Sequence, residues 1–367
     1  MSDSYFDFSI AFDLIFSLQQ TNFGLVSLSL NWLPGLVIFF HHISTNRESK
    51  STLKTLIIAL LSMISYPILL TFTILYVLLK RPKNSRPTKQ FQNALKFLTI
   101  LQVISGCFEA PLQMTYNLWL IFNGVLPSNF GIKCVYVNDF NGNRLCIPAS
   151  ASLSIVFSLL ATMMTVFNLN IPKSSNNGKI RTYLEYGPFL ILATCFKITS
   201  LVVMITMTTW SFIPIIVLIS SNIILHELLL EEEHGVPKWI LTTTSLFIPF
   251  LPTSEITRKS KMFFAAQILL SVVINGITIL VIYLLKVTSQ LNVELILNDV
   301  TYQILVWSTL SMGLVSVIVI IPKFITCSYI EKVGKIWNIV STIIALVLLI
   351  SFVQALILTN NKSGIMQ

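Results

Sequence analysis

The sequence contains few charged residues. Asp, Glu, Lys and Arg together make up 11% of its 367 residues, whereas globular domains carry roughly 25%. Hydrophobic residues make up 54% of the chain, and its mean hydropathy is +0.80. So few polar side chains cannot cover a surface that faces water, which excludes an ordinary soluble domain.

The sequence also lacks the short motifs with which common enzyme classes hold metals, nucleotides or nucleophiles. It contains no CxxC pair, no HExxH, no GxSxG and no Gly-rich phosphate loop. Its four histidines all lie near the ends of apolar segments: His41, His42, His226 and His234. We therefore expect a protein that is not an enzyme and that holds no metal ion and no cofactor.

Long apolar segments dominate the chain. A spanning helix needs about 20 mostly apolar residues, because the bilayer core cannot hydrogen-bond an open backbone. The candidate segments are 5–18, 22–42, 55–79, 95–122, 149–169, 186–208, 211–230, 239–252, 262–285, 302–322 and 336–358. The first is short, carries Asp7 and Asp13, and is followed by no small-residue cleavage site, so we expect a retained helix.

Basic residues flank the segment 55–79 on both sides. They are Arg47, Lys50 and Lys54 before it, and Lys80, Arg81, Lys83, Arg86 and Lys89 after it. The positive-inside rule then places both ends in the cytoplasm, which a single crossing cannot achieve. A re-entrant hairpin that turns near Pro67 removes the contradiction. The alternative is an ordinary tilted span whose flanking charges mislead.

The segment 239–252 has similar features. It is short, contains Pro249 and Pro252, and precedes a basic stretch with Arg258, Lys259 and Lys261. Two re-entrant segments, each after two spanning helices, favour a structural duplication of a kind common in transport proteins. No repeat is convincing at the level of single residues.

These features predict an all-α polytopic membrane protein. It would have about eight spanning helices, two re-entrant hairpins and an extra C-terminal hydrophobic helix. The predicted parts are a first membrane repeat at 1–170, a second at 171–325, and a C-terminal helix and tail at 326–367.

This topology places the loop 124–148 outside and the basic loops in the cytoplasm. The outer loop holds Cys134 and Cys146, which an oxidising exterior would allow to pair, the alternative being two free thiols. The net charge of +9 sits largely in the inner loops, where anionic lipids attract it. That charge is therefore no evidence for a nucleic-acid partner.

Four charged residues are candidates for positions near the bilayer centre: Asp7, Asp13, Glu109 and Lys197. A charge near the bilayer centre costs on the order of 3 kcal/mol, so it usually faces a bundle interior, a partner or water. Gln113 and Asn117 follow Glu109 at four and eight residues, which predicts a polar stripe on one helix face.

Three interpretations of these charges stay open. Lys197 can pair with a carboxylate and simply fix helix packing, or the groups can line a hydrated groove for headgroups or ions. Asp7 and Asp13 can instead snorkel to a nearby interface. Asn275, beside Gly276, is typical of a helix-packing amide that bonds across helices.

One local pattern resembles a known family. Phe108-Glu109-Ala110-Pro111-Leu112-Gln113, followed by Leu118 to Phe122, is similar to a helix of the XK-related membrane proteins, which include apoptotic phospholipid scramblases. Leu112 is an extra residue in that pattern, and Lys197 stands where the family usually has Arg. Shorter resemblances are Gly24-Leu25, Leu33-Pro34-Gly35-Leu36-Val37, Tyr66-Pro67-Ile68-Leu69, Ser152-Leu153-Ser154, Ser158-Leu159-Leu160, Thr257-Arg258-Lys259 and Asn275.

The resemblance implies ATP-independent scrambling of phospholipids, including phosphatidylserine, at the plasma membrane. The lipid path would be lined by Asp7, Asp13, Glu109, Gln113 and Lys197. Phospholipids would be the first partners, with either a single-pass membrane chaperone subunit or a cytoplasmic lipid-transfer protein beside them. The family's fold of eight spanning helices and two re-entrant segments agrees with the architecture above.

The sequence departs from the family in two further respects. The segment 336–358 reads as an added span, and no Asp follows Asp299, so caspases have no substrate in 300–367. Two other classes stay open: a chemoreceptor of about seven helices, and a secondary transporter that uses Asp and Glu for coupled ions.

Overall fold

The computed structural model describes most of the predicted helices. The described residues are 2–45, 52–80, 88–122, 134–138, 144–170, 191–205, 216–217, 219–221, 223–224, 238–244, 247, 258–287 and 306–317. The predicted span 336–358, the tail and most of the inner loops lie outside these ranges, as does most of the second half of the segment 239–252.

The described elements are helical apart from one β-hairpin. The helices are α1 (Ser2–Phe12), α2 (Thr21–Thr45), α3 (Thr52–Ile64), α4 (Tyr66–Leu79), α5 (Lys89–Ile104), α6 (Ala110–Phe122), α7 (Ala149–Asn170), α10 (Lys238–Thr244) and α11 (Arg258–Val287). Two π-helical turns, η1 (Asp13–Ser17) and η2 (Ser105–Glu109), and two strands, β1 (Cys134–Asn138) and β2 (Arg144–Pro148), complete the set. Two more apolar helices are Ile191–Ile205 and Val306–Val317.

Two of these helices are long and apolar enough to cross a membrane. They are Thr21–Thr45 and the continuous helix Lys89–Leu120, which runs through α5, η2 and α6. A third candidate is the bent pair Leu53–Ile64 and Ile68–Leu79, counted as one span. Apolar helices of a membrane protein are thus present as predicted, while the total of eight spans stays a prediction.

The break in the segment 55–79 lies where the sequence predicts it. The axes of α3 and α4 differ by 101° across the break at Ser65. Pro67 stands in the first turn of α4, where its missing N–H leaves no helical hydrogen bond unmade. Such a bend occurs in a broken span and in a re-entrant hairpin, so the side on which each end emerges stays a prediction.

Close backbone contact holds α3 against α2. A Cβ atom added to Gly35 of α2 would lie 2.6 Å from the backbone oxygen of Met63 in α3. Small residues allow this approach, which in a membrane supplies van der Waals packing in place of a hydrophobic driving force. The bent pair is therefore anchored to the first long span.

A π turn interrupts the helix that joins α5 to α6. Pro111 has no N–H, so a regular ladder would leave the carbonyl of Cys107 without its partner. The π turn η2 absorbs the irregularity, with the Ala110 N–H bonded to the Ser105 oxygen. Gly106 brings this turn against α7, because a Cβ there would collide with the Thr165 side chain. Single π turns of this kind occur frequently at functional sites.

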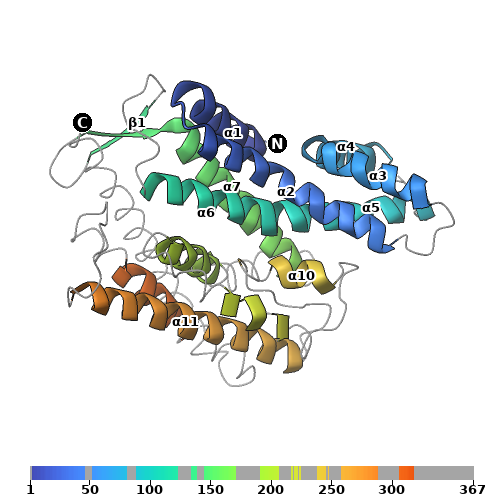
Figure 1. The fold of residues 1–367 in the computed structure, drawn as a ribbon. Coiled ribbons are helices and arrows are strands. Elements are labelled where there is room, and N and C mark those ends of the chain that lie inside the picture. Colours follow the sequence, from blue (N-terminus) through green and yellow to red (C-terminus); the bar gives the residue numbers. More distant parts are fainter. Residues whose placement is uncertain are drawn as a thin grey trace.

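The helices form one bundle around α6 and the Ile191–Ile205 helix. Figure 1 shows α1, α2, α6 and α7 lying close together, with α11 along the other side of the bundle. Buried apolar residues of α5 and α6 pack with those of the Ile191–Ile205 helix in one core. Large apolar side chains also stand on the outer surface, for example Phe16 at 74% and Leu79 at 75% exposure. An apolar outer surface is what lipid tails contact.

Candidate functional site

The predicted polar stripe on α6 is buried inside the bundle. Glu109 ends the π turn η2, and Gln113 and Asn117 follow at one-turn intervals along α6. Their exposures are 4%, 0% and 0%. We call these three residues and their hydrogen-bond partners the polar ladder. Each of the three residues forms, with its partners, one rung of this ladder. Each rung connects η2 or α6 to neighbouring helices.

The first rung joins η2 to the break between α3 and α4. The Tyr66 hydroxyl donates a hydrogen bond of 2.6 Å to Oε2 of Glu109. Tyr66 is 2% exposed and is the first residue of α4. A buried carboxyl group therefore connects the π turn η2 to the break between α3 and α4.

The second rung joins α6 to α2. Nε2 of Gln113 donates to Oδ1 of Asn31 at 2.8 Å and to the backbone oxygen of Ser27 at 3.3 Å. Asn31 and Ser27 are both buried. Oε1 of Gln113 and Nδ2 of Asn31 have no hydrogen-bond partner among the described residues.

The third rung joins α1, α6 and α7 around Asp7. Oδ1 of Asp7 accepts a hydrogen bond of 2.5 Å from the Ser154 hydroxyl. Nδ2 of Asn117 donates to the Ser154 oxygen at 2.8 Å and to Oδ1 of Asp7 at 3.4 Å. Asp7 is 1% exposed, so it lies inside the bundle and does not reach an interface.

The ladder has a definite length and charge pattern. The eight residue steps from Glu109 to Asn117 rise about 12 Å along the helix, which is a sizeable part of the roughly 30 Å hydrocarbon core. A carboxyl group stands at each end, and amide side chains lie between them. Burying these groups is expensive, so their hydrogen bonds are needed to keep the helices together.

The other two predicted charges are Asp13 and Lys197. Asp13 opens the π turn η1 and is only partly buried, and no described hydrogen bond connects its carboxyl group to the ladder. Lys197 is 1% exposed in the Ile191–Ile205 helix. The residues on either side of it, Phe196 and Ile198, belong to the main apolar core. Its predicted pairing with a carboxylate stays a prediction.

A second buried stripe lies on α11. Gln267, Ser271 and Asn275 repeat the four-residue spacing of the ladder, and their exposures are 0%, 1% and 0%. Nδ2 and Oδ1 of Asn275 have no hydrogen-bond partner in the part of the chain that the structure describes. A four-residue spacing is general for one face of a helix, so the duplication stays a prediction.

The two outer cysteines lie on paired strands. The antiparallel register places Cys134 opposite Pro148 and Cys146 opposite Tyr136. The cysteines are thus diagonal neighbours, for which Cα atoms are about 7–8 Å apart, whereas disulfides usually need about 4.4–6.8 Å. A bond between them requires this hairpin to shift or distort, and the disulfide stays a prediction.

Four ladder residues were not predicted as site residues: Tyr66, Asn31, Ser27 and Ser154. The available signal was weak, because a lone Asn or Ser in an apolar segment is also typical of ordinary helix packing. Asn31 gives the clearest signal, because it is the one Asn or Gln that follows Asn22 in the segment 22–42. Which helix each residue faces cannot be read from spacing alone.

Comparison with known proteins identifies no family. No family model, no curated protein and no solved structure matches this chain. The resemblance to XK-related proteins therefore depends on the short patterns around Glu109 and the other residues named with it.

Proposed function

We propose that this chain is a membrane protein of the XK-related type that moves phospholipids between leaflets without ATP. The observation that carries the proposal is the polar ladder, a column of buried carboxyl and amide groups inside a bundle with an apolar outer surface. Exposure of phosphatidylserine at the plasma membrane is the biological outcome that the family resemblance suggests.

The physical problem in scrambling is the headgroup. A zwitterionic or charged headgroup in hydrocarbon loses its hydrogen bonds to water, and each lost bond is costly. Ladder groups can replace those bonds one turn at a time. Gln113 and Asn117 each keep an oxygen without a described partner, which can accept from a headgroup ammonium, and Nδ2 of Asn31 can donate to a phosphate. The acyl tails meanwhile stay against exposed side chains such as Trp32 and Phe40 of α2.

The ladder must open before a headgroup can enter it. The Tyr66–Glu109 hydrogen bond closes its first rung, and Tyr66 follows directly after the break at Ser65. A movement of α4 about this break would separate the two residues while leaving the α2–α3 contact at Gly35 in place. We propose that the bent pair α3–α4 is the gate.

A second candidate is an ion-coupled transporter. Buried Asp7 and Glu109 favour it, because carboxyl groups inside a bundle are typical of ion and proton sites. The two functions differ in their driving force. Scrambling needs no gradient, whereas coupled transport changes with the sodium or proton gradient.

The decisive experiment reconstitutes the purified full-length chain into liposomes that hold a trace of fluorescent phospholipid. Dithionite bleaches only the outer leaflet of sealed protein-free vesicles, so bleaching of the inner-leaflet lipid reports scrambling. We expect Glu109→Gln to slow scrambling about fivefold or more, equivalent to about 1 kcal/mol of barrier. Leu160→Ala, at an exposed position of α7, is the matched control and should not change the rate.

Two results would contradict the proposal. One is an inner leaflet that stays protected with folded wild-type protein present. The other is transport of lipid, or of an ion, that appears only when a sodium or proton gradient is applied, which would favour the transporter.

A further inference from the structure

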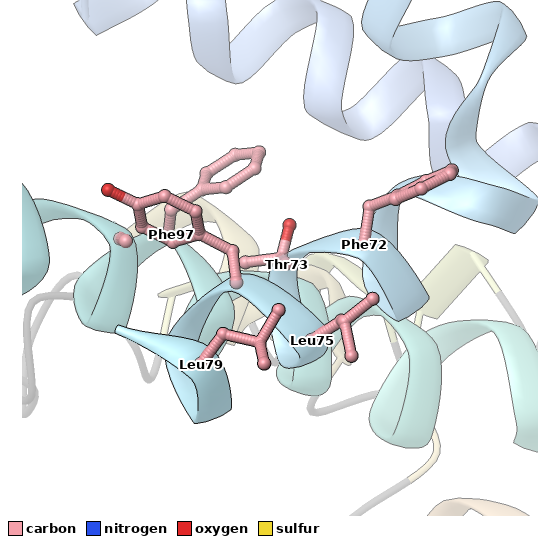
Figure 2. Close-up of a pocket in the computed structure, with 7 residues that line it drawn as sticks. Phe72, Thr73, Leu75, Leu79 and Phe97 are labelled. Atoms are coloured by element: carbon pink, nitrogen blue, oxygen red, sulfur yellow. The ribbon is translucent and has the colours of Figure 1, made fainter. Parts of the chain in front are cut away.

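An open apolar groove lies between α4 and α5, away from the polar ladder. Its volume is about 470 Å³, and its walls include Phe72, Leu75 and Leu79 of α4 and Ala94 and Phe97 of α5. Figure 2 shows Phe72, Leu75 and Leu79 along one helix, with Phe97 of the neighbouring helix at the other wall. The groove therefore runs between consecutive helices of the first half of the chain.

The groove offers hydrocarbon contacts and few hydrogen bonds. Leu79 is 75% exposed and Phe72 is 63% exposed, so the walls are open to the surroundings. The Thr73 hydroxyl, also in the wall, donates to the backbone oxygen of Leu69 at 2.8 Å and is already satisfied. The Tyr76 hydroxyl is the other side-chain polar group in the wall. The part of a ligand that enters the groove is therefore mainly apolar.

Cations gather at the end of the groove where α4 leads into α5. Lys80 directly follows Leu79, and Lys89 is the first residue of α5, with Lys96 next to Phe97. All three lysines are exposed.

No acidic side chain offsets these cations nearby in the sequence. Residues 49–108 contain no Asp and no Glu, and they contain eight cations: Lys50, Lys54, Lys80, Arg81, Lys83, Arg86, Lys89 and Lys96. An apolar groove that ends at uncompensated cations complements one class of molecule. That class has a long hydrocarbon chain and an anionic head.

We propose that the α4–α5 groove binds one anionic phospholipid. An acyl chain lies against Phe72, Leu75 and Phe97, and the headgroup phosphate and carboxylate lie between Lys80 and Lys89. The site is separate from the polar ladder and does not depend on scrambling. Because α4 begins at Tyr66, a bound lipid also holds the helix that closes the first rung.

The test uses photoactivatable lipids in nanodiscs that contain the full chain. Phosphatidylserine and phosphatidylcholine probes, each with a diazirine in the acyl chain, are compared at equal concentration in a phosphatidylcholine bilayer. Crosslinked residues are mapped by mass spectrometry. The reference surface is α11 at Val273 and Ile277, which are 44% and 57% exposed and carry no neighbouring cation.

We expect the serine probe to label the groove in preference to the choline probe by about fivefold for each lysine that contacts it. Both probes should label the α11 reference equally. The double variant Lys80→Gln, Lys89→Gln should bring the preference at the groove close to one. Leu75→Trp, which fills the groove, should lower labelling by both probes there and leave the reference unchanged.

Several outcomes would overturn the inference. Equal labelling by both probes would make the groove an ordinary lipid-facing surface. Weak labelling by both would mean that a protein segment or a second copy of the chain covers it. A preference that survives the double variant would place the headgroup elsewhere. As a control for folding, each variant must elute from size-exclusion chromatography as the wild-type protein does. The labelling pattern is interpreted in the same way whether or not the protein scrambles lipids.

Discussion

The Tyr66 hydroxyl donates a hydrogen bond of 2.6 Å to Oε2 of Glu109, across 43 positions of sequence. Tyr66 opens α4 immediately after the break at Ser65, and Glu109 ends the π turn that precedes Pro111. The α3–α4 break and the π turn η2 are therefore joined by one buried hydrogen bond. In a bundle that must open, such a bond is a natural point of control.

Replacing Tyr66 by Phe should destabilise the protein and loosen this joint. The aromatic ring keeps its packing, but the buried carboxyl group of Glu109 loses a donor, which costs about 1–3 kcal/mol. We expect a lower midpoint of thermal unfolding in detergent. If Tyr66 gates the ladder, Tyr66→Phe should also speed scrambling in liposomes.

A double-mutant cycle isolates the bond itself. Tyr66→Phe combined with Glu109→Leu should cost less than the sum of the two single changes, because each change removes the same hydrogen bond. Full additivity of the unfolding free energies would show that the two residues are not coupled.

The Asp7–Ser154 bond supports a second prediction. Ser154→Ala removes the donor to Oδ1 of Asp7 and the acceptor for Asn117, so two buried groups lose a partner. We expect a loss of about 1–3 kcal/mol in the free energy of unfolding. Ser29→Ala is the control, since the Ser29 hydroxyl is exposed and bonds only to its own helix at Leu25. Equal melting temperatures for the two variants would contradict a structural role for the third rung.

Local features of this fold were readable from the sequence. The four-residue spacing of Glu109, Gln113 and Asn117 fixes a common helix face whatever packs against it. The break near Pro67 also follows from local chemistry, because proline removes a backbone donor. The Asn141-Gly142 pair between the two strands is also a hairpin signal, but the prediction of an all-α protein did not include these strands.

The partners of the stripe were not readable in this way. Asp7 and Ser154 are 147 positions apart, and their contact depends on how α1 and α7 pack on α6. The π turn η2 is also set by packing, since Gly106 approaches α7 there. Spacing on one helix contains no information about the neighbour that it will face.

Two glycines provide a matched test of helix packing. Gly35→Ala should be strongly destabilising, because its Cβ would lie 2.6 Å from the backbone oxygen of Met63, which cannot move without separating α2 from α3. Gly276→Ala should be tolerated, because its Cβ would lie 3.7 Å from Cδ2 of Leu310, an ordinary contact. Alanine at that helical position should even gain about 0.5–1 kcal/mol.

The measurement is the yield and melting temperature of monodisperse protein in detergent. Gly35→Ala should fall well below the wild type, and Gly276→Ala should equal or exceed it. The opposite order, or no difference between the variants, would show that the α2–α3 contact is not close in the folded protein.

The last prediction concerns the side of the membrane on which the bent pair α3–α4 begins and ends. Positions 48 and 84 lie outside the described residues, one before α3 and one after α4. Basic residues surround both, and the positive-inside rule predicts that both face the cytoplasm. Single cysteines, Glu48→Cys and Asn84→Cys, are placed in a chain whose five native cysteines are replaced by Ser or Ala. An impermeant maleimide applied to intact cells should label neither position, and permeabilisation should expose both. A cysteine in the outer loop, at Asn141, is the positive control for labelling from outside.

Labelling of position 48 and position 84 from opposite sides would mean that the 101° bend belongs to a broken span that crosses the membrane. That result would remove the re-entrant gate and leave the hydrogen bond between Tyr66 and Glu109 as an ordinary contact between two spans.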